Sequence, residues 1–154
     1  MRMSNKVKLT SRGRYAVMAM VELAQKDDGK PVPLSEIAEA GNISLSYLEQ
    51  LFAGLKKNGL VKSYRGPGGG YILAKPSKDI LVSEILTSAE DCVPAKRATN
   101  ADKPDAYGNP QTHALWSYIS DILYATMRHV TLDDVTHDNI NEHPQMNKFL
   151  EMLG

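Results

Sequence analysis

The sequence predicts a mainly α-helical fold that contains one small β-hairpin. Three observations lead to this prediction. Apolar residues recur at helical spacing in the first 60 residues, the run Gly66-Pro67-Gly68-Gly69-Gly70 separates two short segments of β character, and a longer helical pattern occupies residues 112–130. Two helices joined by a short turn and followed by a hairpin form a winged helix-turn-helix domain. We therefore predict such a domain followed by a long helix.

The first helix is predicted over residues 11–25. Thr10 or Ser11 can cap its N-terminus, and apolar residues then recur at helical spacing. The run Asp27-Asp28-Gly29 ends it, because glycine readily adopts the backbone conformation that terminates a helix.

Two shorter helices follow, and a tight turn joins them. The first covers residues 34–40, and Gly41-Asn42 forms the turn. Ser44 opens the second helix, which ends near residues 58–59. One face of this second helix carries the apolar residues Tyr47, Leu48, Leu51, Phe52 and Leu55.

The hairpin joins two segments of β character, residues 60–64 and 71–73. The glycines between them supply the positive φ angles that a tight connection needs. A turn at residues 76–79 and a further helix over residues 81–90 complete this part of the chain.

The longest helical pattern runs from Thr112 to Val130, with Trp116 beside its apolar stripe. A lone helix after a loop cannot bury such a stripe by itself. Packing against the same helix of a second copy would bury it, so we predict a homodimer. The alternative is that the stripe packs against its own winged domain. The stripe consists of Leu115, Ile119, Ile122, Leu123, Thr126 and Met127.

Charge is unevenly distributed, although the chain has a formal net charge of +0. Residues 1–75 carry 12 Lys and Arg against 6 Asp and Glu, whereas residues 76–154 carry 6 against 12. A basic half joined to an acidic half indicates that one half meets a polyanion, and a chance fluctuation of composition is the alternative.

Other classes of protein are disfavoured. No apolar run approaches the roughly 18 residues of a transmembrane helix, and the charged start lacks the apolar core of a secretory signal. We therefore expect a cytoplasmic protein without a membrane partner. We do not expect an enzyme, since the glycine run lies between two strands, whereas a phosphate-binding loop opens a helix.

The winged domain predicts double-stranded DNA as the partner, with its second turn-linked helix in a major groove and its hairpin at the adjacent minor groove. Gln50 can bond adenine, Glu49 can accept from cytosine, and Arg65 suits a narrow minor groove. The alternative for these residues is that they are merely solvated surface residues. Tyr47 could lie in the core, face the groove or contact a phosphate, and the sequence leaves these three positions open. The candidate base-reading residues are Ser44, Ser46, Tyr47, Glu49, Gln50 and Arg65. The candidate phosphate contacts are Arg12, Arg14, Lys56, Lys57 and Lys62.

The chain closely resembles the IscR-like family of winged-helix transcription regulators, the iron–sulfur cluster regulators of bacteria. The resemblance implies that Ser46, Glu49 and Gln50 face bases, that Arg65 enters the minor groove and that the long helix forms the dimer. The glutamate would discriminate between classes of operator. The matching runs are L-T-S-R-G-R-Y-A-V (9–17), I-S-L-S-Y-L-E-Q-L-F (43–52), K-N-G-L-V (57–61), R-G-P-G-G-G-Y (65–71) and T-H-A-L-W (112–116).

The resemblance also implies a [2Fe–2S] cluster, with His113 at the position of the family's histidine ligand. The family's pattern places three cysteines in the preceding loop, whereas the aligned positions here are Ala98, Pro104 and Pro110. The only cysteine of the chain, Cys92, lies nearer the start of that loop. A cluster with three cysteines and one histidine is therefore impossible, and we predict Cys92 and His113 as ligands.

The remaining cluster ligands stay open. Histidine can replace cysteine on a cluster iron, and a carboxylate is a further substitute. His129 is a weak candidate, because it lies about 24 Å from His113 along a helix that rises 1.5 Å per residue. For Cys92 the alternative is a small buried residue, and for His113 it is a helix-start histidine that bonds backbone or solvent. The acidic candidates are Asp91, Asp102 and Asp105.

The predicted organisation has four segments. Residues 1–80 form the winged helix-turn-helix DNA-binding domain, and residues 81–111 form a helix and the candidate cluster-binding loop. Residues 112–138 form the dimerisation helix and a short helix with a capping-like start. Residues 139–154 form a weakly amphipathic tail that we expect to fray.

The sequence thus predicts a dimeric DNA-binding repressor of iron-uptake and iron–sulfur assembly genes that responds to iron or cluster status. A cluster with few thiolates would be readily lost, which suits a sensor, and a two-fold dimer suits a near-palindromic operator. A repressor that senses nitric oxide or redox state through the cluster is a variant of this prediction. The alternative is a cluster-free winged-helix regulator controlled by a protein partner or a small-molecule effector, and the missing cysteines favour it.

Overall fold

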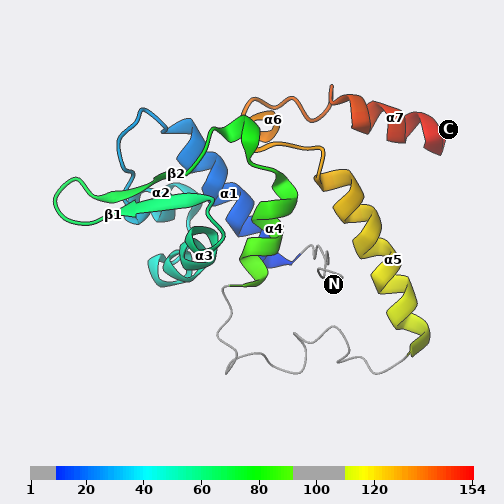
Figure 1. The fold of residues 1–154 in the computed structure, drawn as a ribbon, viewed down its shortest axis with the longest axis horizontal. Coiled ribbons are helices and arrows are strands. Elements are labelled where there is room, and N and C mark those ends of the chain that lie inside the picture. The colour runs from blue at the N-terminus through cyan, green and yellow to red at the C-terminus, as the bar shows by residue number, and fades with distance from the viewer. Residues whose placement is uncertain (1–9, 92–109) are drawn as a thin grey trace.

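The computed structural model describes residues 10–91 and 110–154 (Figure 1). The winged domain contains α1 (Ser11–Gln25), α2 (Leu34–Gly41), α3 (Leu45–Lys57), β1 (Val61–Tyr64) and β2 (Gly70–Leu73). The chain continues with the 3-10 helix η1 (Ser77–Asp79), α4 (Val82–Glu90), α5 (Pro110–Met127), α6 (Leu132–Thr136) and α7 (Pro144–Leu153). The mainly α-helical fold with one hairpin is confirmed.

Helix α1 crosses the centre of the winged domain (Figure 1). It begins at the predicted cap, where Thr10 Oγ1 accepts a hydrogen bond from the backbone N of Gly13 at 3.2 Å. Ala16 and Ala19 are completely buried, and α1 packs most extensively against α4. Small side chains at these positions let two helices approach closely, which makes α4 an integral part of the winged domain.

The main core joins all of the helices that surround α1. Its largest fully buried side chains come from α1, α2, α3, α4, α6 and the segments between them. Burying one such side chain contributes about 1.5–3 kcal/mol. The fully buried set is Phe52, Met20, Leu23, Ile37, Leu48, Leu51, Leu55, Leu60, Ile80, Ile85 and Leu132.

The wing is an antiparallel hairpin whose register pairs Val61 with Leu73 and Tyr64 with Gly70. Its base is held by Val32, which exchanges two backbone hydrogen bonds of 2.9 Å with Tyr71. Only glycine fits at Gly70, because its φ is +150° and an added Cβ would lie 2.3 Å from the carbonyl oxygen of Val32. The hairpin therefore leaves the body in a fixed direction.

The long helix α5 is anchored at its C-terminal end. Val82 N donates to Val130 O at 2.9 Å and Leu132 N donates to Ile80 O at 2.8 Å, so the chain after α5 pairs with the chain before α4. A second, smaller core joins Val82, Leu86 and Val130 to the last turns of α5. The first turns of α5 extend away from the winged domain (Figure 1).

The C-terminal segment differs from the frayed tail that the sequence predicts, because residues 144–153 form α7. Pro144 occupies the first position of this helix, and His143 Nδ1 accepts a hydrogen bond from Gln145 N at 3.3 Å. His143 Nε2 also lies 3.5 Å from a carboxylate oxygen of Asp134, which belongs to α6. This histidine cap is a signal that helical periodicity alone does not contain.

No helix among the described residues is both long and apolar enough to span a bilayer.

Candidate nucleic-acid interface

A tight turn leads the chain into α3. Asn42 adopts a left-handed conformation with φ of 51°, and Ile43 N donates to Ala38 O at 2.9 Å, which ends α2. Ser44 then caps α3, because its Oγ accepts a hydrogen bond from the backbone N of Tyr47 at 3.1 Å. The predicted helix-turn-helix connection is confirmed.

One face of α3 is buried and the opposite face is exposed. Leu48, Leu51, Phe52 and Leu55 anchor the helix in the core. The polar candidates at the start of α3 and along it are all exposed. Glu49 and Gln50 lie three and four residues after Ser46, so each shares a side of the helix with that serine. The hydroxyl oxygens of Ser44 and Ser46 are 3.3 Å apart. These exposed candidates are Ser44, Ser46, Glu49 and Gln50.

Two aromatic rings border this polar face. The half-buried ring of Tyr47 meets the ring of Tyr15 edge-on, with centroids 5.7 Å apart and an interplanar angle of 85°. Tyr47 therefore lies between α3 and α1, at the edge of the core. Leu45, the first residue of α3, has 44% of its surface exposed beside the polar candidates. Our sequence reasoning missed Tyr15 and Leu45, although a hydrophobic residue between two serines at the start of a helix is a detectable signal.

Arg65 is exposed in the wing, directly after β1. The loop that follows is closed by a hydrogen bond of 2.9 Å from Gly69 N to Gly66 O. Tyr64 precedes Arg65 and is 51% exposed, so an aromatic ring accompanies the guanidinium on the wing. Our sequence reasoning assigned Tyr64 to a strand only and did not expect this exposure.

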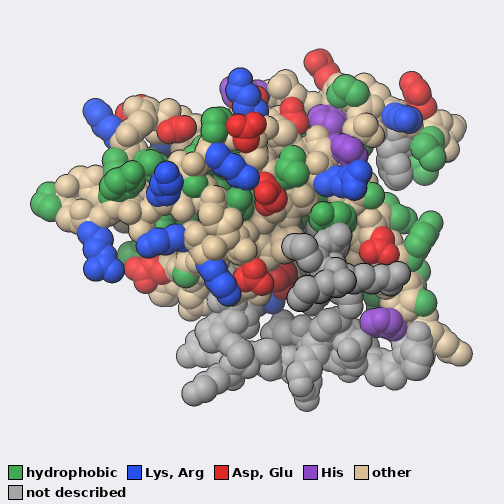
Figure 2. Space-filling model, viewed as in Figure 1, with side chains coloured by type: hydrophobic (Ala, Val, Ile, Leu, Met, Phe, Trp, Pro, Cys, Tyr) green, Lys and Arg blue, Asp and Glu red, His purple; other side chains and the backbone are tan. Residues whose placement is uncertain are grey.

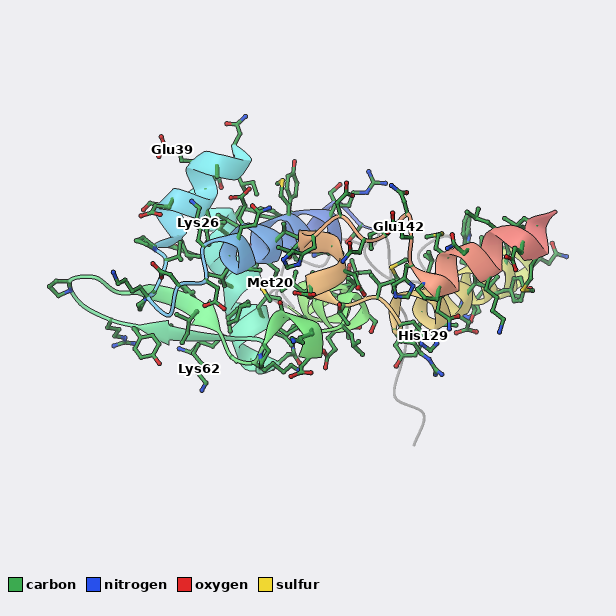
Figure 3. The ribbon with its side chains drawn as sticks, turned by 90° about the horizontal axis from the view of Figure 1, so that it is seen from above. Met20, Lys26, Glu39, Lys62, His129 and Glu142 are labelled. Atoms are coloured by element: carbon green, nitrogen blue, oxygen red, sulfur yellow. The ribbon has the colours of Figure 1, made fainter. Side chains whose placement is uncertain are left out.

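The predicted phosphate contacts have two different environments. Arg14, Lys57 and Lys62 are exposed, and Lys62 extends from the hairpin away from the body (Figure 3). Lys56 is exposed as well, but its Nζ donates a 2.7 Å hydrogen bond to Ser63 Oγ and so links α3 to β1. Lys and Arg side chains are spread over the surface of the winged domain (Figure 2).

Arg12 is the most restrained of the predicted phosphate contacts. Its Nη2 lies 3.3 Å from Glu90 Oε2, and both side chains are only 20% exposed. Thr10 Oγ1 donates to the other oxygen of Glu90 at 2.7 Å. The start of α1 is therefore bound to the end of α4. Sequence reasoning does not reveal this connection, because Arg12 and Glu90 are 78 positions apart in the chain.

The candidate cluster ligands are only partly described. Cys92, Asp102 and Asp105 lie outside the described residues. His113 is exposed in the first turns of α5, and His129 is exposed after its end, where its Nε2 accepts from Arg128 Nε at 3.5 Å. In residues 10–91 and 110–154, no three His, Cys, Asp or Glu side chains are grouped so that they could hold a metal ion.

The apolar stripe of α5 divides into two parts. Leu123 and Met127 pack against the second core, as the intramolecular alternative expected. Leu115, Trp116, Ile119 and Ile122 are exposed, with 55% of the Trp116 surface accessible. Hydrophobic side chains are accordingly visible along α5 in Figure 2.

Comparisons with known proteins agree with this geometry. The model of the Rrf2 family, described as an iron-dependent transcriptional regulator, matches residues 9–138. The HTH-type transcriptional regulator IscR of Escherichia coli (strain K12 / DH10B) is 45% identical over 132 residues, which cover 86% of this chain and 82% of that protein.

Two solved structures are also similar. That of T. potens IscR has a TM-score of 0.64 and 35% identity, and the match covers 88% of this chain and 90% of the other. That of CymR, the global cysteine regulator of B. subtilis, has a TM-score of 0.63 and 33% identity, and the match covers 84% and 96%. The Escherichia coli protein is named as a transcriptional regulator and CymR as a global cysteine regulator, and none of these names is that of an enzyme.

Proposed function

This chain belongs to the Rrf2 family of transcriptional regulators, and we propose that it acts as a homodimeric repressor of iron-uptake and iron–sulfur cluster assembly genes. The observation that carries the proposal is the exposed polar face of α3, which is anchored by a buried apolar face beside an arginine-bearing wing. We expect the protein to act in the cytoplasm, because its proposed partner is double-stranded DNA.

We propose that α3 reads bases in the major groove. Gln50 has the donor and acceptor that adenine needs, and Glu49 can accept from the amino group of cytosine while repelling acceptor edges. Ser44 and Ser46 can bond bases or phosphates at the start of the helix. Arg65 would enter the minor groove, where a narrow groove strengthens the negative potential.

The basic residues would set affinity rather than sequence preference. Arg14, Lys57 and Lys62 are exposed and available to phosphates. Lys56 would contribute charge while it holds the wing through Ser63. Arg12 would contribute through its position beside Glu90, at the start of α1.

We propose that the exposed apolar residues of α5 form the dimer interface. Trp116 and Ile119 lie on the part of the helix that extends from the winged domain, where their own chain leaves them exposed. Exposed apolar patches of this kind favour association with another protein surface. A two-fold dimer presents two copies of α3, and this arrangement suits a near-palindromic operator.

The signal that we propose is a labile iron–sulfur cluster of the [2Fe–2S] type that the family resemblance implies, with Cys92 and His113 among its ligands. One thiol and one exposed histidine do not fit the usual set of three cysteines and one histidine. The same observation favours a second candidate, a cluster-free regulator controlled by a protein partner or a small-molecule effector. Both candidates use the same DNA-binding surface.

Anaerobic purification followed by visible absorption, iron and acid-labile sulfide measurements tests the signal. For the cluster sensor we expect charge-transfer bands with stoichiometric iron and sulfide in the wild type and a loss of both in Cys92→Ala and His113→Ala. A colourless wild-type protein that still binds operator DNA would reject the cluster and support the second candidate. A wild type without sequence-specific DNA binding would reject both.

A further inference from the structure

Two carboxylates occupy an electrostatically unfavourable position at the end of α4. Glu90 is the last residue of the helix and Asp91 is its C-cap, where the partial negative charge of the helix dipole repels them. The last turn contains no basic residue that would compensate. Helix stability therefore does not explain these two acids, and their contacts with other elements must be considered.

Glu90 fixes the start of α1. Its Oε1 accepts a hydrogen bond from Thr10 Oγ1 at 2.7 Å, and its Oε2 lies 3.3 Å from Arg12 Nη2. Both oxygens of one carboxylate are thus used by neighbouring residues of the same helix start. Thr10 also caps α1, so the position of the cap and the position of Arg12 depend on the end of α4.

Asp91 fixes the end of α3. Its Oδ2 accepts a hydrogen bond from Asn58 Nδ2 at 3.1 Å. Asn58 is the C-cap of α3, and the same amide nitrogen donates to the carbonyl oxygen of Gly54 at 2.9 Å. The end of the helix that carries Glu49 and Gln50 is therefore bound to the residue next to Glu90.

We propose that Glu90 and Asp91 are positioning residues for DNA binding, which hold the start of α1 and the end of α3 in one arrangement through the end of α4. This inference rests on the proposed function, because it requires the surface of α1 and α3 to bind DNA. Phosphate contacts from one helix and base contacts from the other must match the duplex at the same time. A small rotation of either helix would break that match.

Charge alone predicts the opposite of this proposal. Removing a carboxylate from a DNA-binding domain lowers its repulsion from phosphates and should strengthen binding to any duplex. Removing it from the C-terminal end of a helix should also leave the helix as stable or more stable. If Glu90 and Asp91 are positioning residues, their removal should instead weaken binding to the operator while the domain stays folded.

The test compares Glu90→Ala, Asp91→Ala and Asn58→Ala in the full chain. The probes are a duplex selected from random sequence by the wild-type protein and an unrelated duplex of equal length. We expect the operator Kd to rise about threefold to tenfold, the range for partly exposed hydrogen bonds to a carboxylate, while binding to the unrelated duplex is unchanged or tighter. The thermal unfolding midpoint should stay at or above the wild-type value in Asp91→Ala, whereas Glu90→Ala also loses two part-buried contacts and should unfold at a somewhat lower temperature.

Two controls make the result specific. Glu39→Ala removes an exposed carboxylate on α2, on the side of the body away from Lys62 (Figure 3). Its binding to both duplexes should be unchanged or tighter. Asp91→Asn keeps an oxygen that can accept from Asn58, so it should retain operator affinity. The double variant Asn58→Ala/Asp91→Ala should bind the operator no more weakly than Asn58→Ala, because that single variant already removes the bond between Asn58 and Asp91.

The outcomes separate this inference from the proposed function. Wild-type protein that selects no sequence would overturn the proposed function, and the inference with it. Selective wild-type binding combined with unchanged or tighter operator binding in the alanine variants would overturn the inference alone. Additive losses in the double variant would overturn the role of the bond between Asn58 and Asp91.

Discussion

Helices α3 and α5 each carry an apolar stripe, but they use it in opposite ways. In α3 the stripe is buried, with Leu48, Phe52 and Leu55 completely inaccessible, and the polar face is left to solvent. In α5 only the last turns are covered, and Trp116 and Ile119 stay exposed. The same periodicity thus yields a rigidly held polar face in one helix and an unpaired apolar face in the other.

The largest expected effect comes from the buried side of α3. Phe52→Ala should lower the free energy of unfolding by about 3–5 kcal/mol, because it removes a fully buried ring that also meets Tyr71 edge-on. Chemical denaturation followed by circular dichroism measures this change. The neighbouring exposed Ala53→Ser should change stability by about 0.5 kcal/mol or less. Equal effects of the two substitutions would contradict the anchored arrangement of α3.

The next effect concerns the base of the wing. Gly70→Ala should destabilise the protein by about 3 kcal/mol, since the new Cβ would meet the backbone of Val32 at a strained φ. Gly68→Ala is the matched control, because its φ is also positive but an added Cβ meets nothing within 4 Å. We expect it to cost about 1 kcal/mol. Thermal unfolding of both variants measures the difference, and a milder Gly70→Ala would contradict the close contact with Val32.

Substitutions on α5 should act on association instead of folding. Trp116→Glu or Ile119→Glu should raise the dimer dissociation constant about thirtyfold, because each partly covered side chain contributes about 1 kcal/mol and a two-fold dimer loses both copies, about 2 kcal/mol in total. Analytical ultracentrifugation measures this constant. Ala125→Glu, an exposed position elsewhere on the same helix, should leave it nearly unchanged. If all three variants dimerise like the wild type, α5 is not the interface.

The smallest effect separates base readout from phosphate contact. Arg65→Ala should weaken operator binding about tenfold and lower the slope of log K against log salt by about 1. Lys57→Ala should lower the slope to a similar extent but weaken operator and unrelated duplexes equally. Fluorescence anisotropy at several salt concentrations measures both quantities. Equal losses on both duplexes for Arg65→Ala would remove the wing from sequence recognition.

Local signals made much of the fold predictable. The caps at Thr10 and Ser44 and the capping box between Thr131 and Asp134 are encoded within a few residues, so the helix starts follow from the sequence. The resemblance to IscR-like regulators was likewise carried by contiguous runs, and the family match confirms it.

The contacts that join distant segments were not predictable. The pairing of Thr10 and Arg12 with Glu90, and of Asn58 with Asp91, depends on how α4 packs across the domain. Nor did periodicity show that Leu123 and Leu115, on one stripe, would have different surroundings. Such outcomes are decided by tertiary packing, which a window of consecutive residues does not contain.

The anchor of α5 has a consequence for the geometry of target sites. Helix α5 continues into the winged domain through the short pairing of Val130 and Leu132 with the chain on either side of Leu81. In a dimer held by the first turns of α5, this junction would set the separation and the relative rotation of the two copies of α3. Because two backbone hydrogen bonds and the second core hold this junction, an operator whose spacer differs by one base pair, about 3.4 Å of duplex, should bind more weakly.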